Sequence, residues 1–155
     1  MAENADLIKL YSARILALAS DIPHHARLEG AQSSAKRRSP LCGSTVTIDL
    51  DMQDGRVIRF GQDVKACALG QAAAAILGQV VIGRNAAELA VARDQLHAML
   101  TADGPVPDAP FDGFEVLLPA RDYRNRHASI LLALDAAVEA TASLSAAKTA
   151  PSESG

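Results

Sequence analysis

Residues 45–62 constrain the fold most strongly, because they carry the pattern of a half-buried strand and its return. From Thr45 to Met52 polar and apolar residues alternate, which predicts one face toward a core and one toward solvent. Asp54-Gly55 follows, a dipeptide typical of tight hairpin turns. We expect 56–62 to return as a second strand and 64–67 to add a short third. The pattern therefore predicts a three-stranded antiparallel meander.

Helical patterns surround this sheet, which makes the chain α+β with about four to five helices. Apolar residues recur at helical spacing in 5–19, where Asn4 would cap the helix. Alanine, the best helix former, fills 68–77. Asn85 and Glu88 have the spacing of a capping box for a helix that ends near residue 100. A last helix is expected from about His127 to residue 142.

The length fits a single domain. The chain has 155 residues, of which 49% are hydrophobic, enough for one core. We place this domain at 1–142. Within it, 21–40 lacks any period and contains Pro23, Gly30 and a basic run, which favours a long mobile loop. The small polar residues of 143–155 predict a disordered C-terminal tail.

Charge and hydropathy exclude several classes of function. A net charge of -3 gives no basis for nucleic-acid binding. No run reaches the roughly 18 uninterrupted apolar residues of a membrane span. The first six residues are polar and acidic, unlike a secretory signal. We therefore expect a cytoplasmic protein, in which two cysteines are free thiols or ligands rather than a disulfide.

The two cysteines and one histidine stand at the ends of predicted elements. Cys42 follows the loop and precedes Gly43, Cys67 opens the alanine-rich helix, and His127 opens the last helix. A helix N-terminus stabilises a thiolate. Thiolates and imidazoles are preferred ligands of zinc and iron–sulfur clusters, so a two-cysteine metal site with His127 is one hypothesis. A buried, inert thiol at each position is the other.

Other chemistries have less support. No phosphate-binding glycine motif or zinc-protease motif is present. A nucleophilic pair of Cys67 and His127 is conceivable but lacks a signature. The remaining histidines, His24, His25 and His97, are expected to be solvated or partly exposed.

Several segments together resemble the NifU/IscU/SufU family of iron–sulfur cluster assembly scaffolds. Pro40-Leu41-Cys42-Gly43, the alternating strand and Asp54-Gly55 resemble the first cysteine region of the family. Val64 to Ala72 resembles the second cysteine and its small-residue helix. Leu118-Pro119-Ala120-Arg121 and the helix after His127 resemble the third region, and the long stretch between Gly78 and Pro119 resembles the SufU-type insertion.

The resemblance implies a transient cluster or zinc ion held by three cysteines and an aspartate. This chain departs at two of those positions. Ser44 stands where the aspartate is expected, and the third cysteine is replaced by His127 or, in another alignment, by Ala128. His127 is then the metal-capable residue of that region. Asp122 or a water molecule could fill the fourth position.

Three functions follow as expectations. The first is a non-enzymatic scaffold or carrier that binds iron or a [2Fe–2S] cluster through Cys42, Cys67 and His127. It would take sulfur from a cysteine desulfurase and pass the cluster to recipient apo iron–sulfur proteins. The second is a zinc-bound persulfide acceptor with sulfurtransferase activity. The third is a metal-free interaction protein. The sequence leaves a homo-oligomer open.

Overall fold

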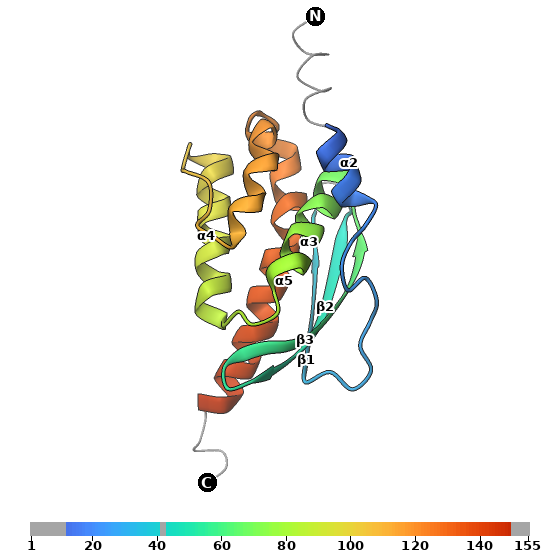
Figure 1. The fold of residues 1–155 in the computed structure, drawn as a ribbon, viewed down its shortest axis with the longest axis vertical. Helices are drawn as coiled ribbons and strands as arrows, with labels where there is room; N and C mark the ends of the chain where they lie inside the picture. The colour runs from blue at the N-terminus through green and yellow to red at the C-terminus, as the bar shows by residue number, and fades with distance from the viewer. Residues whose placement is uncertain (1–11, 41–42, 150–155) are drawn as a thin grey trace, which may run out of the picture.

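The computed structural model describes residues 12–40 and 43–149, with side chains up to 144 (Figure 1). In this part of the chain an antiparallel sheet packs against helices, so the predicted α+β class is confirmed. The strands are β1 (Ser33–Arg38), β2 (Thr45–Gln53) and β3 (Arg56–Lys65). The helices are α2 (Ala13–Ala19), α3 (Ala68–Val80), α4 (Ala86–Thr101), the 3-10 helix η1 (Phe111–Asp122) and α5 (Arg124–Thr149).

The sheet has three strands as predicted, but one of them comes from a different segment of the chain. Its order is β1-β2-β3, with both pairs antiparallel. The third strand expected at 64–67 is wrong, because β3 continues unbroken to Lys65 opposite Thr45. The expected mobile loop over 21–40 is also wrong in its second half, which forms β1. This edge strand buries only Ser33 and Ala35, so its sequence lacks an apolar alternation.

The helix α5 is the centre of the molecule. It contacts β1, β2, α3, α4 and η1, and Figure 1 shows it between the sheet and α4. Val46, Ile48 and Leu50 of β2 are fully buried in the core. Small side chains such as Ala133, Ala136 and Ala137 line α5, which allows the elements around it to approach closely.

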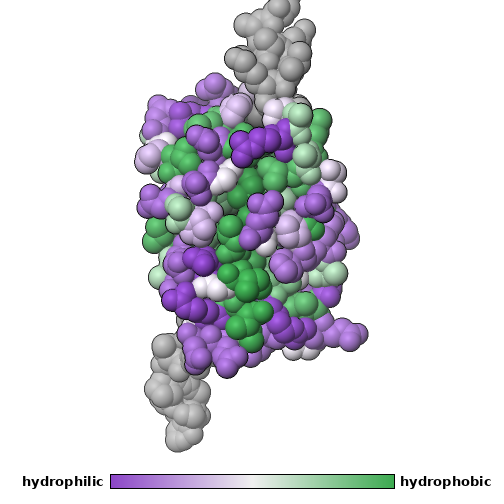
Figure 2. Space-filling model, viewed as in Figure 1, coloured by the Kyte–Doolittle hydropathy of each residue, from purple (hydrophilic) through white to green (hydrophobic). Residues whose placement is uncertain are grey.

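One helix segment, Arg124–Leu144 of α5, is long and apolar enough to span a membrane by length and composition. Its most apolar window is mostly buried, which is the arrangement of a core helix. On the face drawn in Figure 2, a narrow apolar band runs between polar side chains.

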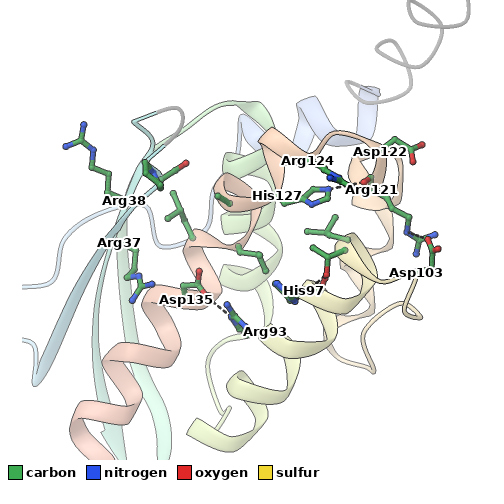
Figure 3. A pocket seen from close by; sticks show the side chains of 17 residues that line it. Arg37, Arg38, Arg93, His97, Asp103, Arg121, Asp122, Arg124, His127 and Asp135 are labelled. Carbon is green, nitrogen blue, oxygen red and sulfur yellow. Dashed lines mark hydrogen bonds and ion pairs between the residues drawn. The ribbon is translucent and has the colours of Figure 1, made fainter.

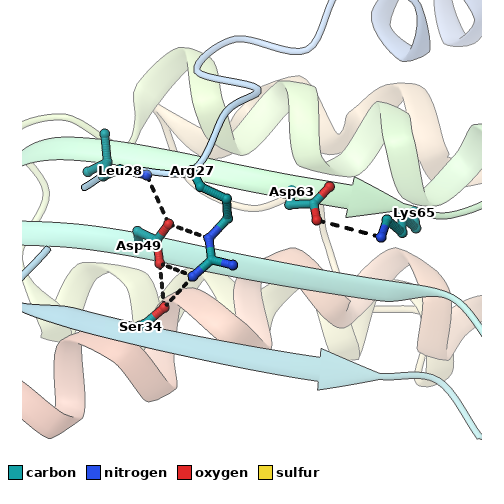
Figure 4. A network of polar contacts seen from close by, with 6 residues as sticks. All are labelled: Arg27, Leu28, Ser34, Asp49, Asp63 and Lys65. Carbon is teal, nitrogen blue, oxygen red and sulfur yellow. Dashed lines mark hydrogen bonds and ion pairs between the residues drawn. The ribbon is translucent and has the colours of Figure 1, made fainter. Parts of the chain in front are cut away.

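The outer face of the sheet is covered by residues 21–32, a segment that we call the strap. Asp49 of β2 accepts hydrogen bonds from Arg27 Nε at 2.6 Å, from the Leu28 N–H at 3.0 Å and from the Ser34 hydroxyl (Figure 4). Beside it, Asp51 accepts from the Gln32 N–H at 2.8 Å. The strap therefore satisfies the carboxylates that β2 buries.

Burial and hydrogen bonding act on Asp49 in opposite directions. Burial on its own would raise the pKa of Asp49. The hydrogen bonds from Arg27, Ser34 and the Leu28 N–H, with the charge of Arg27, outweigh burial and hold the pKa below its ordinary value. Asp49 is therefore ionised in the folded protein at neutral pH.

The predicted starts of α3 and α4 agree with the structure, whereas α5 begins at Arg124 rather than at His127. Asn85 accepts from the Glu88 N–H at 2.7 Å and Glu88 accepts from the Asn85 N–H at 3.0 Å, which is the predicted capping box. The first predicted helix is described only as α2, capped by Ser12, and Asn4 lies outside the described residues. The backbone of α5 reaches Thr149, so the segment expected to form a disordered tail begins as helix.

Candidate functional site

Cys67 is the N-cap residue of α3, as the sequence predicts. It is half-buried, and its side chain makes no capping hydrogen bond. The main-chain N–H groups of the first turn of α3 therefore have no side-chain partner from Cys67. The positive end of the helix dipole lies at this residue. The thiolate is the form of cysteine that binds metal and attacks sulfur.

A buried serine of α5 joins Cys67 to the start of β2. Ser129 Oγ lies 3.5 Å from Cys67 Sγ, and either atom can be the donor. The same hydroxyl donates to Ser44 Oγ at 3.3 Å. Ser129 and Ser44 are both buried. The hydroxyl of Ser129 thus contacts both Cys67, the second cysteine, and Ser44, which stands at the position of the expected aspartate.

Cys42 lies outside the described residues. It belongs to the connection between β1 and β2, whose ends are closed by two main-chain hydrogen bonds. The Ser39 N–H donates to the Ser44 carbonyl at 2.8 Å, and the Gly43 N–H donates to the Ser39 carbonyl at 3.0 Å. Gly43 has φ +72°, a conformation that favours glycine. The backbone conformation at residue 43 therefore explains why a glycine follows the first cysteine.

His127 is buried and faces the end of η1. Its Nε2 lies 3.0 Å from the carbonyl oxygens of Ala120 and Arg121. Because both partners are acceptors, Nε2 carries the proton and donates to them. Residues two apart on an α-helix point about 200° apart around its axis. His127 and Ser129 therefore leave α5 on different sides, and only Nδ1 of His127 could bind a metal.

Within residues 12–40 and 43–149, no group of three or more His, Cys, Asp or Glu side chains could hold a metal ion. The other histidines have local partners. The His24 ring meets Phe60 edge-on, His25 Nε2 accepts from the Val64 N–H, and His97 Nδ1 lies 3.4 Å from the Thr101 hydroxyl. Asp122 is exposed. The structure thus brings Cys67 and Ser44 to one hydroxyl group, that of Ser129, and the pairing of Cys67 with His127 as metal ligands stays a prediction.

Ser129 is the residue of this site that sequence reasoning missed. A serine inside an apolar helix carries no motif, and its proximity to Cys67 depends on how α5 crosses α3. Gly70 allows the two helices to approach closely at this crossing, because a Cβ atom there would lie only 2.7 Å from Ser129 Oγ. A glycine three residues after Cys67 is the one sequence signal for a close approach.

Comparisons with known proteins give matches among solved structures. No model of a known protein family matches the chain, and no curated protein sequence matches it. The chain is similar to the N-terminal part of a nitrogen-fixing NifU-like protein from Brucella abortus, with 40% identity and a TM-score of 0.88 over 91% of this chain and 98% of that chain.

Two further solved structures share the fold at lower identity. One is a putative iron–sulfur cluster assembly scaffold protein for the SUF system from Fervidobacterium islandicum AW-1, at 18% identity and TM-score 0.77, covering 86% of this chain and 98% of that chain. The other is a hypothetical protein at 20% identity and TM-score 0.73, covering 87% of this chain and 98% of that chain.

Proposed function

Because the chain belongs to the NifU-like family of the NifU/IscU/SufU type, we propose that it is a scaffold or carrier for iron–sulfur cluster assembly. Its cargo is iron or a [2Fe–2S] cluster, bound by the thiolates of Cys42 and Cys67. A cysteine desulfurase supplies the sulfur, and apo iron–sulfur proteins receive the cluster. The protein works in the cytoplasm.

The observation that supports this function most directly is the hydroxyl of Ser129. It contacts both Cys67 Sγ and Ser44 Oγ. Cys42 is two residues from Ser44 along the chain, and two residues extend at most about 7 Å. The second cysteine is therefore near the segment that carries the first, although twenty-four residues separate them in sequence. Thiolates in such a pair are suitable iron ligands.

The number of ligands bears on how the cluster is bound. A [2Fe–2S] cluster takes four protein ligands, and this chain has two cysteines. His127 through Nδ1 as a third ligand stays a prediction, with Ser44, Asp122 or water as the fourth. The alternative is that two chains each contribute Cys42 and Cys67 to one cluster. The second arrangement needs neither His127 nor Asp122 and would make the loaded form a homodimer.

Anaerobic reconstitution with iron and sulfide tests the proposal. Iron and sulfide near one each per chain, with visible thiolate-to-iron absorption and a loaded dimer, are expected for a shared cluster. Values near two per chain in a monomer would place a whole cluster on one chain. Cys42→Ala and Cys67→Ala should each abolish the chromophore. Absence of iron and chromophore in the wild-type protein would contradict the scaffold, and absence of zinc as well would support the metal-free interaction protein.

A second function, a zinc-bound persulfide acceptor, is favoured by the position of Cys67 alone. A thiolate at the start of α3 could attack the outer sulfur of a persulfide on the desulfurase cysteine. The new S–S bond forms at Cys67, the old one breaks, and the desulfurase cysteine leaves as a thiolate. Two thiolates and one imidazole are a suitable donor set for zinc. Zinc near one per chain without a chromophore, and persulfide labelling at Cys67, would favour this function.

A further inference from the structure

An open groove begins at Ser39 and Pro40, at the end of β1, and basic side chains line it around a floor of largely buried apolar residues. Its volume is about 890 Å³. It runs from the end of β1 across α5 to α4 and η1, and Figure 3 shows its labelled residues around the rim. The floor includes Leu100, Leu131 and Ala128.

The groove concentrates positive charge in an acidic protein. Five arginines and three aspartates line it, whereas the whole chain has a net charge of -3. The arginines come from β1, α4, η1 and the start of α5, so residues far apart in sequence contribute to one field. They are Arg37, Arg38, Arg93, Arg121 and Arg124.

Two of these arginines have fixed positions within the protein. Arg93 Nε bonds Asp135 at 2.7 Å, and this contact raises the pKa of Arg93 above its ordinary value. Arg121 Nε donates to the Met99 carbonyl at 2.7 Å, and its Nη2 donates to the Gly104 carbonyl at 3.1 Å. Their guanidinium groups therefore serve mainly to build the wall of the groove.

Arg37 and Arg124 are available to a ligand. Arg124 is exposed and forms no ion pair or side-chain hydrogen bond with any described residue. Arg37 is half-exposed, and its contact with Glu139 uses only Nη1. Exposed ion pairs of this kind contribute little to folding. These two arginines lie on opposite sides of the groove, one on β1 and one on α5.

The position of Arg124 is unfavourable for the helix that carries it. It is the first residue of α5, whose first turn has no acidic residue. The N-terminus of a helix is the positive end of the dipole, so a cation there is repelled rather than stabilised. Helix stability does not account for Arg124, whereas attraction of an anion does. The dipole and the side chain both favour a negative group at this end of the groove.

We propose that this groove docks an acidic segment of a partner protein that also carries leucine-like side chains. Carboxylates would meet Arg37 and Arg124, and apolar side chains would cover the floor between them. The groove is open along its length, which suits a chain segment better than an enclosed small molecule. It includes Pro40, His127 and Ala128, so a docked partner would lie next to the proposed cargo site.

Binding of a fluorescent peptide of alternating Glu and Leu, followed by anisotropy, tests this inference. Arg37→Ala/Arg124→Ala should weaken binding about tenfold, because two ion pairs with the carboxylates of the peptide are lost. Affinity should also fall as salt rises from about 50 to about 200 mM. The matched control is Arg14→Ala/Lys65→Ala, which removes two exposed cations outside the groove and should bind like the wild type.

Two altered peptides test the chemistry. Gln in place of Glu should abolish binding, and Ser in place of Leu should weaken it. Equal binding of the Gln peptide, or an unchanged affinity of the groove variant, would overturn the proposal. Citrate that competes as well as the peptide would mean a small-anion site instead and would also overturn it. The inference is independent of the metal, so Cys42→Ala/Cys67→Ala should bind the peptide normally even if the scaffold proposal fails.

Discussion

Ser129 Oγ of α5 lies 3.5 Å from Cys67 Sγ at the start of α3. The contact connects a buried hydroxyl to a half-buried thiol, and the hydroxyl has a second partner in Ser44. When Cys67 is a thiolate it can only accept, so Ser129 then donates to sulfur. A hydrogen bond to the charged form stabilises that form.

We therefore expect Ser129→Ala to slow the alkylation of Cys67. In a Cys42→Ala background Cys67 is the single cysteine, so iodoacetamide reports on it alone. Loss of one hydrogen bond of about 1 kcal/mol predicts a roughly fivefold slower reaction at neutral pH. Ser143→Ala, an exposed serine on the same helix, is the control. Equal rates in both variants would show that Ser129 does not act on the sulfur.

Asp49→Asn should reduce the free energy of unfolding by about 1–3 kcal/mol, because the variant cannot accept the same set of hydrogen bonds. The carboxylate is almost fully buried, whereas Arg27 is 57% exposed, so solvent weakens the charge part of the pair. Urea unfolding at neutral pH measures the loss. Asp54→Asn in the exposed turn is the control and should unfold like the wild type.

The same carboxylate predicts a pH dependence of stability. The pKa of Asp49 is lowered in the folded protein, so the folded state binds its proton less readily than the unfolded state does. The stabilisation by Asp49 is therefore fully present at pH values above its pKa in the unfolded state, which is about 4. It is lost as pH falls through the pKa of the folded state. Between neutral pH and pH about 2, the free energy of unfolding should fall less steeply in Asp49→Asn than in the wild type. Parallel curves would contradict this account.

His127→Ala is expected to weaken metal retention more than the equivalent change at His24, His25 or His97. It should also lower the melting temperature, since the carbonyls of Ala120 and Arg121 lose a donor. His127→Gln separates the two effects, because an amide N–H can donate but does not replace imidazole as a ligand. Normal metal content in His127→Gln would remove His127 from the site.

Gly61→Ala should loosen the strap. A Cβ atom at this position would collide with the carbonyl oxygen of Ala26 and lie 2.9 Å from Leu28 Cγ. We expect a loss of about 1–3 kcal/mol in the free energy of unfolding. Gly113→Ala is the matched control, because its new methyl group would meet Ile76 at an ordinary 3.4 Å. Similar stability of the two variants would mean that the strap shifts without cost.

The sequence predicts the parts of the fold that have local signals. Alternation from Thr45 to Met52, the Asp54-Gly55 turn and the Asn85–Glu88 capping box each depend on residues near one another in the chain. β1 has no such signal, because Ser33 and Ala35 are held by β2 and α5 rather than by their own pattern. The Ser33 hydroxyl, for example, donates to the carbonyl of Ala140.

The candidate site likewise has features with a local sequence signal and features without one. The place of Cys67 at a helix start follows from the alanines after it. Its contact with Ser129 depends on the rotation of α5 about its axis, which the sequence pattern does not determine. The groove was missed for a similar reason, because its walls come from segments as far apart as Arg37 and Asp135 and meet only in the folded chain.

The central place of α5 has a consequence for the order of events during synthesis. Every other described element precedes α5 in the chain, and the inner face of β2 is covered by it. A ribosome releases the sheet and Cys67 first, while Val46, Ile48 and Leu50 still lack their cover. Ser129 reaches Cys67 only after α5 has emerged. The contact between Ser129 and Cys67 therefore forms only in chains whose last helix has docked, and the proposed cargo site cannot be complete before then.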